Sequence, residues 1–168
     1  MRFVRSVALI ASWIVCAAPA AAQTSVGFVQ PDRYTDAENR WGSGLSLRVT
    51  LGEMRRLFTE LGNRIVPPGQ SLAIEVLDID LAGLDQPGAN QPYGLRVVTD
   101  ITPPRFVLRY ALKERGRILL SGQETVSDLN FLTRYGGRAA SSTTFYYERE
   151  LIRDWLQSRF VLRRPPRG

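Results

Sequence analysis

The stretch Ser71–Gly83 decides the fold, and it reads Ser-Leu-Ala-Ile-Glu-Val-Leu-Asp-Ile-Asp-Leu-Ala-Gly. From Leu72 to Val76 every second residue is a large aliphatic, which is the period of a β-strand with one buried face. After Val76 the alternation changes parity and continues with Leu77, Ile79 and Leu81. The stretch therefore predicts a central strand that is either apolar on both faces or bulged near Val76.

An amphipathic helix is predicted just before this strand. Apolar residues recur at helical spacing over residues 51–65, and Thr50 with Glu53 fits a capping box at the helix start. Gly62-Asn63 can close the helix, and Pro67-Pro68 prevents its continuation. Three further apolar residues leave open an extra helical turn or a short preceding strand: Leu45, Leu47 and Val49.

The remaining pattern completes an α+β domain. Residues 26–29 and 95–98 read as short strands, and residues 105–127 read as an antiparallel hairpin that turns at Gly116. Residues 145–160 have the stripe of a second amphipathic helix. Glycine-rich and polar loops are expected over residues 83–94 and 135–144. We expect an antiparallel sheet of four or five strands with the two helices on one face.

The first 22 residues have the features of a secretory signal peptide. Arg2 and Arg5 precede an apolar run over residues 7–16, and Ala20-Ala21-Ala22 has the small side chains that a signal peptidase requires. The run is shorter than the roughly 20 apolar residues that a membrane-spanning helix needs. We therefore expect cleavage after Ala22, a periplasmic protein, one domain over residues 23–160 and a basic tail over residues 161–168.

Composition excludes several kinds of catalytic site. The chain has no histidine, and its one cysteine, Cys16, lies in the predicted signal peptide. Ser-His-Asp triads, thiol nucleophiles and zinc sites built from histidine or cysteine are thereby excluded. No cofactor is predicted. Removal of Arg2 and Arg5 leaves 20 basic residues against 16 acidic ones, a net charge of +4. We expect no nucleic-acid partner, because no basic motif interleaved with aromatic residues is present.

Acidic residues on two predicted strands are the candidate binding residues. Asp78 and Asp80 share one strand face, and Asp128 with Asn130 has the same spacing at the end of another strand. If these strand ends meet, their oxygens can hold a hard cation such as Ca²⁺ or Mg²⁺ and serve a metal-dependent hydrolase. The interpretation we favour pairs Asp78 and Asp80 with Arg105 or Arg109 and places Asp128 in a turn, with no metal.

Two further features allow a structural and a functional interpretation. Trp155 lies on the predicted last helix beside Tyr147, where an aromatic stripe usually enters the core, although an exposed tryptophan here would be a binding candidate. Three arginines of the basic tail are either solvated or contact an anionic membrane surface: Arg163, Arg164 and Arg167.

Four motifs carry a resemblance to a known family: residues 77–83, 104–110, 127–131 and 147–155. Over residues 28–160 the chain resembles a family of exported proteobacterial proteins catalogued as a domain of unknown function. The resemblance implies export and a single domain, and it assigns no activity or site residues. We therefore expect a non-catalytic module that binds a protein or an envelope component. The alternatives are the hydrolase above and a carrier of small molecules or lipids.

Overall fold

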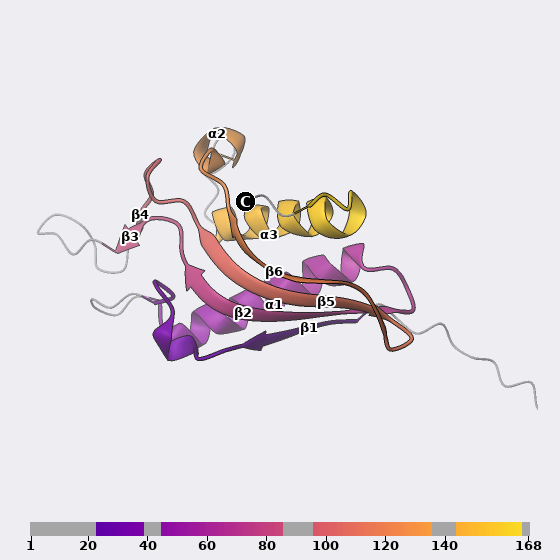
Figure 1. Ribbon diagram of the computed structural model, residues 1–168. Helices are drawn as coiled ribbons and strands as arrows, with labels where there is room; N and C mark the ends of the chain where they lie inside the picture. Colours follow the sequence, from indigo (N-terminus) through magenta and orange to yellow (C-terminus); the bar gives the residue numbers. More distant parts are fainter. Residues whose placement is uncertain (1–22, 39–44, 86–95, 136–143, 166–168) are drawn as a thin grey trace, which may run out of the picture.

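The computed structural model describes residues 23–38, 45–85, 96–135 and 144–165 (Figure 1). The predicted signal peptide and most of the two predicted loops lie outside these residues. The helices and strands are β1 (Gln23–Phe28), η1 (Pro31–Arg33), α1 (Leu47–Ile65), β2 (Gln70–Asp80), β3 (Leu84–Asp85), β4 (Arg96–Val97), β5 (Arg105–Glu114), β6 (Arg117–Ser127), α2 (Phe131–Tyr135), α3 (Tyr146–Leu156) and η3 (Gln157–Val161).

Four strands form the main sheet in the order β1-β2-β5-β6, and β3 pairs with β4 in a separate two-stranded sheet. β2, β5 and β6 are antiparallel neighbours, as predicted. β1 instead runs parallel to β2, because α1 connects the two strands as a crossover and returns the chain in the same direction. The fold class predicted from the sequence is confirmed, with this one parallel pair added.

A β-bulge explains the change of parity in the central strand. Val76 pairs with Leu108 and Asp78 pairs with Val107, so Leu77 is the extra residue on β2. The bulge returns the later aliphatic residues of β2 to the buried face. The carbonyl of Val76 accepts two hydrogen bonds, from the Tyr34 hydroxyl at 2.6 Å and from the Val29 amide at 3.0 Å. The bulged alternative predicted from the sequence is therefore correct.

One face of the sheet carries the core, and both helices pack on it. α1 lies along β1, and α3 lies nearer β6 (Figure 1). The two helices and the alternate residues of β2 and β5 form a single cluster whose most buried members include Met54, Phe58, Ile74, Ile79, Phe106, Leu108, Ile152 and Leu156. No helix of the described part of the chain covers the opposite face, where residues such as Ala73, Glu75 and Arg109 lie.

The ends of α1 differ from the prediction. α1 begins at Leu47, and Ser46 caps it by accepting a hydrogen bond from the Val49 amide. Thr50 therefore lies inside the helix, where it is fully buried, and the predicted Thr50–Glu53 capping box is wrong. Gly62 does not close the helix either, because α1 continues to Ile65 and ends just before Pro67.

The C-terminal half follows the prediction with two additions. The hairpin forms with Gly116 at positive φ, and the predicted last helix is α3 continued by η3. The short helix α2 was not predicted. The start of the basic tail folds back on η3, since the Arg164 amide donates to the Ser158 carbonyl at 3.0 Å. Among the described residues, no helix is long and apolar enough to cross a membrane.

Candidate functional site

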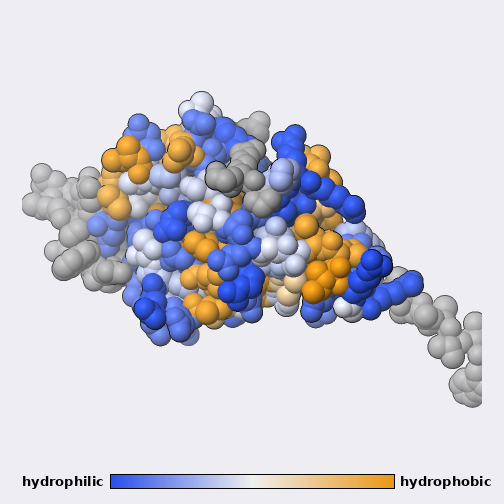
Figure 2. Space-filling model, viewed as in Figure 1, coloured by the Kyte–Doolittle hydropathy of each residue, from blue (hydrophilic) through white to orange (hydrophobic). Residues whose placement is uncertain are grey.

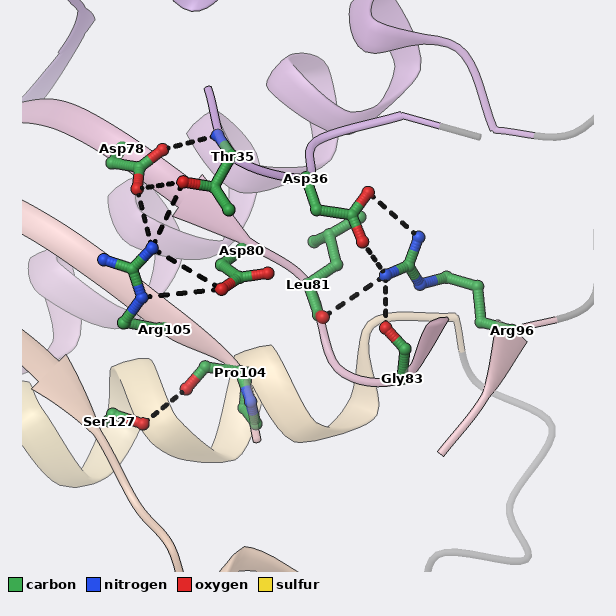
Figure 3. A network of polar contacts seen from close by, with 10 residues as sticks. All are labelled: Thr35, Asp36, Asp78, Asp80, Leu81, Gly83, Arg96, Pro104, Arg105 and Ser127. Atoms are coloured by element: carbon green, nitrogen blue, oxygen red, sulfur yellow. Dashed lines mark hydrogen bonds and ion pairs between the residues drawn. The ribbon is translucent and has the colours of Figure 1, made fainter. Parts of the chain in front are cut away.

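The predicted residues Asp78, Asp80 and Arg105 meet on the face of the sheet that the helices leave open (Figure 3). The register places Asp80 opposite Arg105, whose Nη2 donates to Asp78 Oδ2 at 2.9 Å and to Asp80 Oδ2 at 3.5 Å. Asp78 also accepts hydrogen bonds from the amide and hydroxyl of Thr35, both at 2.7 Å. The predicted cross-strand pairing with Arg105 is confirmed, and both Asp78 oxygens are occupied.

Two residues that the sequence analysis did not single out, Arg96 and Asp36, hold the turn after β2. Arg96 forms an ion pair with Asp36 and donates to the carbonyls of residues 81–83 (Figure 3). From the other side, the buried Glu148 carboxylate accepts a hydrogen bond from the Ala82 amide at 2.8 Å, and burial raises the pKa of this carboxyl. The turn is therefore fixed by charged side chains from α3 and β4.

A surface hollow of about 650 Å³ opens over this network. Asp80 from β2, Arg105 from β5 and Ser127 at the end of β6 line it. Two large aliphatic residues stand at its rim, Ile101 and Leu129, which are 83 % and 77 % exposed. We call this hollow the β2-end groove. Its lining combines aliphatic side chains with a few polar and charged ones, as the lining of a binding pocket does.

Asp80 is the carboxylate with remaining capacity to accept hydrogen bonds. Among the described residues its side chain bonds only to Arg105, at the long distance of 3.5 Å. Partial burial raises the pKa of Asp80, and the negative charges of Asp36 and Asp78 raise it further, while Arg105 opposes the shift. A donor or cation entering the groove would therefore find an acceptor that the protein itself leaves underused.

Asp128 lies away from Asp78 and Asp80, because it follows Ser127 and so points to the other face of the sheet. Its Oδ1 accepts a hydrogen bond from the Asn130 amide at 3.0 Å, and its other oxygen pairs with Arg134. This is the predicted turn, and the Asn130 side chain is exposed beyond it.

The alternative prediction of a shared cation site is therefore not supported. Within the described ranges, no three acidic residues come close enough together to hold a metal ion. Asp128 lines a separate hollow of about 300 Å³ between β6 and α3. The alternative of a metal-dependent hydrolase required that these carboxylates converge, and they do not.

Trp155 belongs to the core, as predicted. Its ring packs edge-on against Phe58 and Tyr110, and its Nε1 donates to Glu124 Oε1 at 3.0 Å. Glu124 also forms an ion pair with Arg159, and both of these side chains are only 6 % exposed. The sequence analysis missed this pair, although the position of Glu124 two residues before the buried Val126 was a signal that it faces the helices.

The comparisons with known proteins give a family and no activity. No curated protein and no solved structure matches the chain. One family, described as a protein of unknown function (DUF3016), matches residues 22–158, which include every strand of the main sheet, both long helices and the β2-end groove. The chain therefore belongs to the DUF3016 family.

Proposed function

We propose that this chain is an exported, non-catalytic binding module of the cell envelope, and that the β2-end groove receives a segment of a protein partner. The observation that carries the proposal is the groove itself, in which exposed aliphatic residues surround an underused carboxylate. Burying Ile101 and Leu129 against a partner would remove apolar surface from water, which is the main favourable term in protein association.

The charges around the groove indicate what the partner segment presents. Three carboxylates and two guanidinium groups form the network below it, which leaves one negative charge: Asp36, Asp78 and Asp80 against Arg96 and Arg105. A partner lysine or arginine would balance this charge and bond to Asp80. The segment we propose therefore carries an aliphatic side chain next to a basic one.

The sequence lacks two of the commonest catalytic side chains, which favours a binding role. Histidine is missing, and the cysteine-free chain that follows the predicted signal peptide has no thiol. Asp78 and Asp128 are held by arginines and backbone amides, so neither is positioned as a free general base.

Site-specific photo-crosslinking in living cells tests the groove. A photo-reactive residue at Leu129 should give one discrete protein adduct, and Asp80→Asn should reduce its yield by removing the charge that attracts the partner. Val49, an exposed aliphatic residue on α1, is the matched control position and should give no such adduct. Equal adducts at both positions, or none at Leu129, would contradict the proposal.

Export is tested separately, by the mass of the mature protein. The charged start, the apolar run and the Ala20–Ala22 site support cleavage before Gln23, and the family match begins at residue 22. Mass spectrometry of periplasmic material should find a chain that begins at Gln23. A chain that retains Met1 would contradict export.

A further inference from the structure

β6 forms one edge of the main sheet, and no strand of the described chain pairs with its outer side. An edge strand leaves about half of its backbone amides and carbonyls without a partner, so it can pair with a strand from another chain. The register of β6 with β5 shifts once, at Leu119, and residues 120–127 follow without a bulge. These residues include no proline or lysine, which often protect an exposed edge.

The opposite edge of the sheet is partly occupied by α1. β1 is six residues long, and its Thr24 amide donates a hydrogen bond to the Asn63 side chain of α1 at 2.8 Å. Within the described ranges, no backbone hydrogen bond reaches β6 from outside the sheet. β6 is therefore the more open of the two edges.

The hollow of about 300 Å³ between β6 and α3 lies along this open edge. Its lining includes every residue from Glu124 to Asp128. Neighbouring residues of a strand point to opposite faces, so a hollow lined by consecutive residues follows the edge of the strand. The opposite wall is a stripe along α3 and η3 with members three or four residues apart: Leu151, Trp155, Ser158 and Leu162. We call this hollow the β6–α3 groove.

The β6–α3 groove and the β2-end groove meet at the end of β6, because Thr125 and Ser127 line both of them. A strand paired with β6 would place alternate side chains on the two faces of the sheet, one set towards each groove. On the face shown in Figure 2, hydrophobic residues form small separate areas among hydrophilic ones. Main-chain pairing would add affinity that such small areas do not supply.

We propose that the partner segment binds as an added β-strand along the outer edge of β6, over residues 123–127. This inference rests on the proposed function, since it takes the segment in the β2-end groove to continue along β6. The side chain that enters the β6–α3 groove is aliphatic, because Val126, Leu151 and Leu162 offer apolar surface there. Most charged residues of the lining already pair with one another: Glu124 with Arg159, and Arg134 with Asp128 and Asp154.

Photo-crosslinking in living cells, followed by sequencing of the linked peptides, tests the added strand. Thr125 on the open face and Leu162 at the mouth of the β6–α3 groove are both exposed, so each can carry a photo-reactive residue. The two adducts should map to one partner segment, at positions an odd number of residues apart, because alternate residues of a strand face opposite sides. Links in different segments, or an even number of residues apart, would overturn the proposal.

A variant that fills the β6–α3 groove gives a second test. Ser158 is half-buried in its wall, so Ser158→Trp should exclude the partner side chain and lower the adduct yield at Thr125 roughly tenfold, the effect of losing one anchoring contact. Val161→Trp, at an exposed residue of η3 outside the groove, is the matched control and should leave the yield unchanged. Equal yields from the two variants would contradict the added strand. The peptide mapping uses neither substitution and decides the question if Ser158→Trp does not fold.

The crosslinks also separate this inference from the proposed function. An adduct at Leu129 without one at Leu162 would overturn the added strand and leave the β2-end groove as a binding site. The absence of adducts at Leu129, Thr125 and Leu162 would contradict both.

Discussion

Asp78 and Asp80 show that two carboxylates on one strand face can have different roles. Asp78 accepts hydrogen bonds from Thr35 and Arg105, so its charge fastens the segment before α1 to the sheet. Asp80 has only a long contact with Arg105, and burial raises its pKa. The difference depends on Thr35, which lies 43 residues from Asp78 along the chain. The spacing of Asp78 and Asp80 on the strand predicted that they share a face. Their different roles depend on contacts that only the folded structure shows.

Tyr34 gives the first prediction, because its hydroxyl bonds to the carbonyl of Val76 at the bulge. Tyr34→Phe should lower the free energy of unfolding at neutral pH by about 1 kcal/mol, the net contribution of one hydrogen bond. Burial raises the pKa of Tyr34 to about 12 from 10.0. Its contribution is therefore fully present below pH 10.0 and is lost as the pH rises towards 12.

Urea unfolding of both proteins across this alkaline range checks the prediction. The difference in unfolding free energy between the native chain and Tyr34→Phe should shrink as the pH rises. The other tyrosines titrate in both proteins and cancel in the comparison. A difference that stays constant to pH 12 would contradict the burial of this hydroxyl.

Alanine substitution at two glycines of α1 should change the stability of the protein in opposite directions. A Cβ at Gly62 would lie 2.5 Å from Oγ1 of Thr24 on β1, whereas a Cβ at Gly52 would meet nothing within 4 Å. Gly52→Ala should stabilise the protein by about 0.5–1 kcal/mol through helix propensity. Gly62→Ala should instead destabilise it by about 1–3 kcal/mol, because the helix cannot approach β1 as closely. Equal shifts in the melting temperature would contradict this account of the contact.

Trp155 anchors α3 to the sheet. Trp155→Ala would remove its ring contacts with Phe58, Tyr110 and Phe160 and one donor from the buried Glu124. The expected loss is about 3–5 kcal/mol, a large part of the stability of a domain of this size. Chemical denaturation measures it, and an unchanged midpoint would mean that the ring is not in the core.

The sequence predicts a helix or strand correctly where the pattern of neighbouring residues alone determines it. The parity change after Val76 predicted either a strand apolar on both faces or a bulge, and the structure has the bulge, whose extra residue returns the later aliphatic residues to one face. The predicted start of α1 was wrong because Thr50 and Glu53 match a capping motif. The residue that caps the helix is Ser46, one helical turn earlier. The parallel pairing of β1 had no local signal, since it depends on how α1 packs.

The same limit applies to the candidate site. The sequence supplied Asp78, Asp80 and Arg105, which one strand face and its neighbour bring together. It did not supply Asp36 and Arg96, which are 60 residues apart and meet only through the turn after β2. The exposed rim of the β2-end groove was also not predicted, because exposure of Ile101 and Leu129 depends on what the rest of the chain leaves uncovered.

At the scale of the whole molecule, both helices pack on one face of the sheet, and the β2-end groove lies at one end of the other face (Figure 1). Asp80 is the one carboxylate among the described residues that line the groove. The central claim is that Asp78 and Asp80 do not share a cation with Asp128, on which the proposed binding role depends. Asp128 supports it, because its carboxylate caps a turn on the other face of the sheet from Asp80.

The most direct test of this claim is the melting temperature in the presence of Ca²⁺, Mg²⁺ or Mn²⁺. A cation that binds only the folded protein adds about 2.7 kcal/mol of stability at a hundredfold excess over its Kd. We expect none of the three ions, at millimolar concentration, to raise the melting temperature, and we expect Asp128→Asn to be mild because asparagine can accept the same turn hydrogen bond. A clear rise with one of these ions that Asp80→Asn or Asp128→Asn abolishes would contradict the claim and restore the metal-dependent hydrolase.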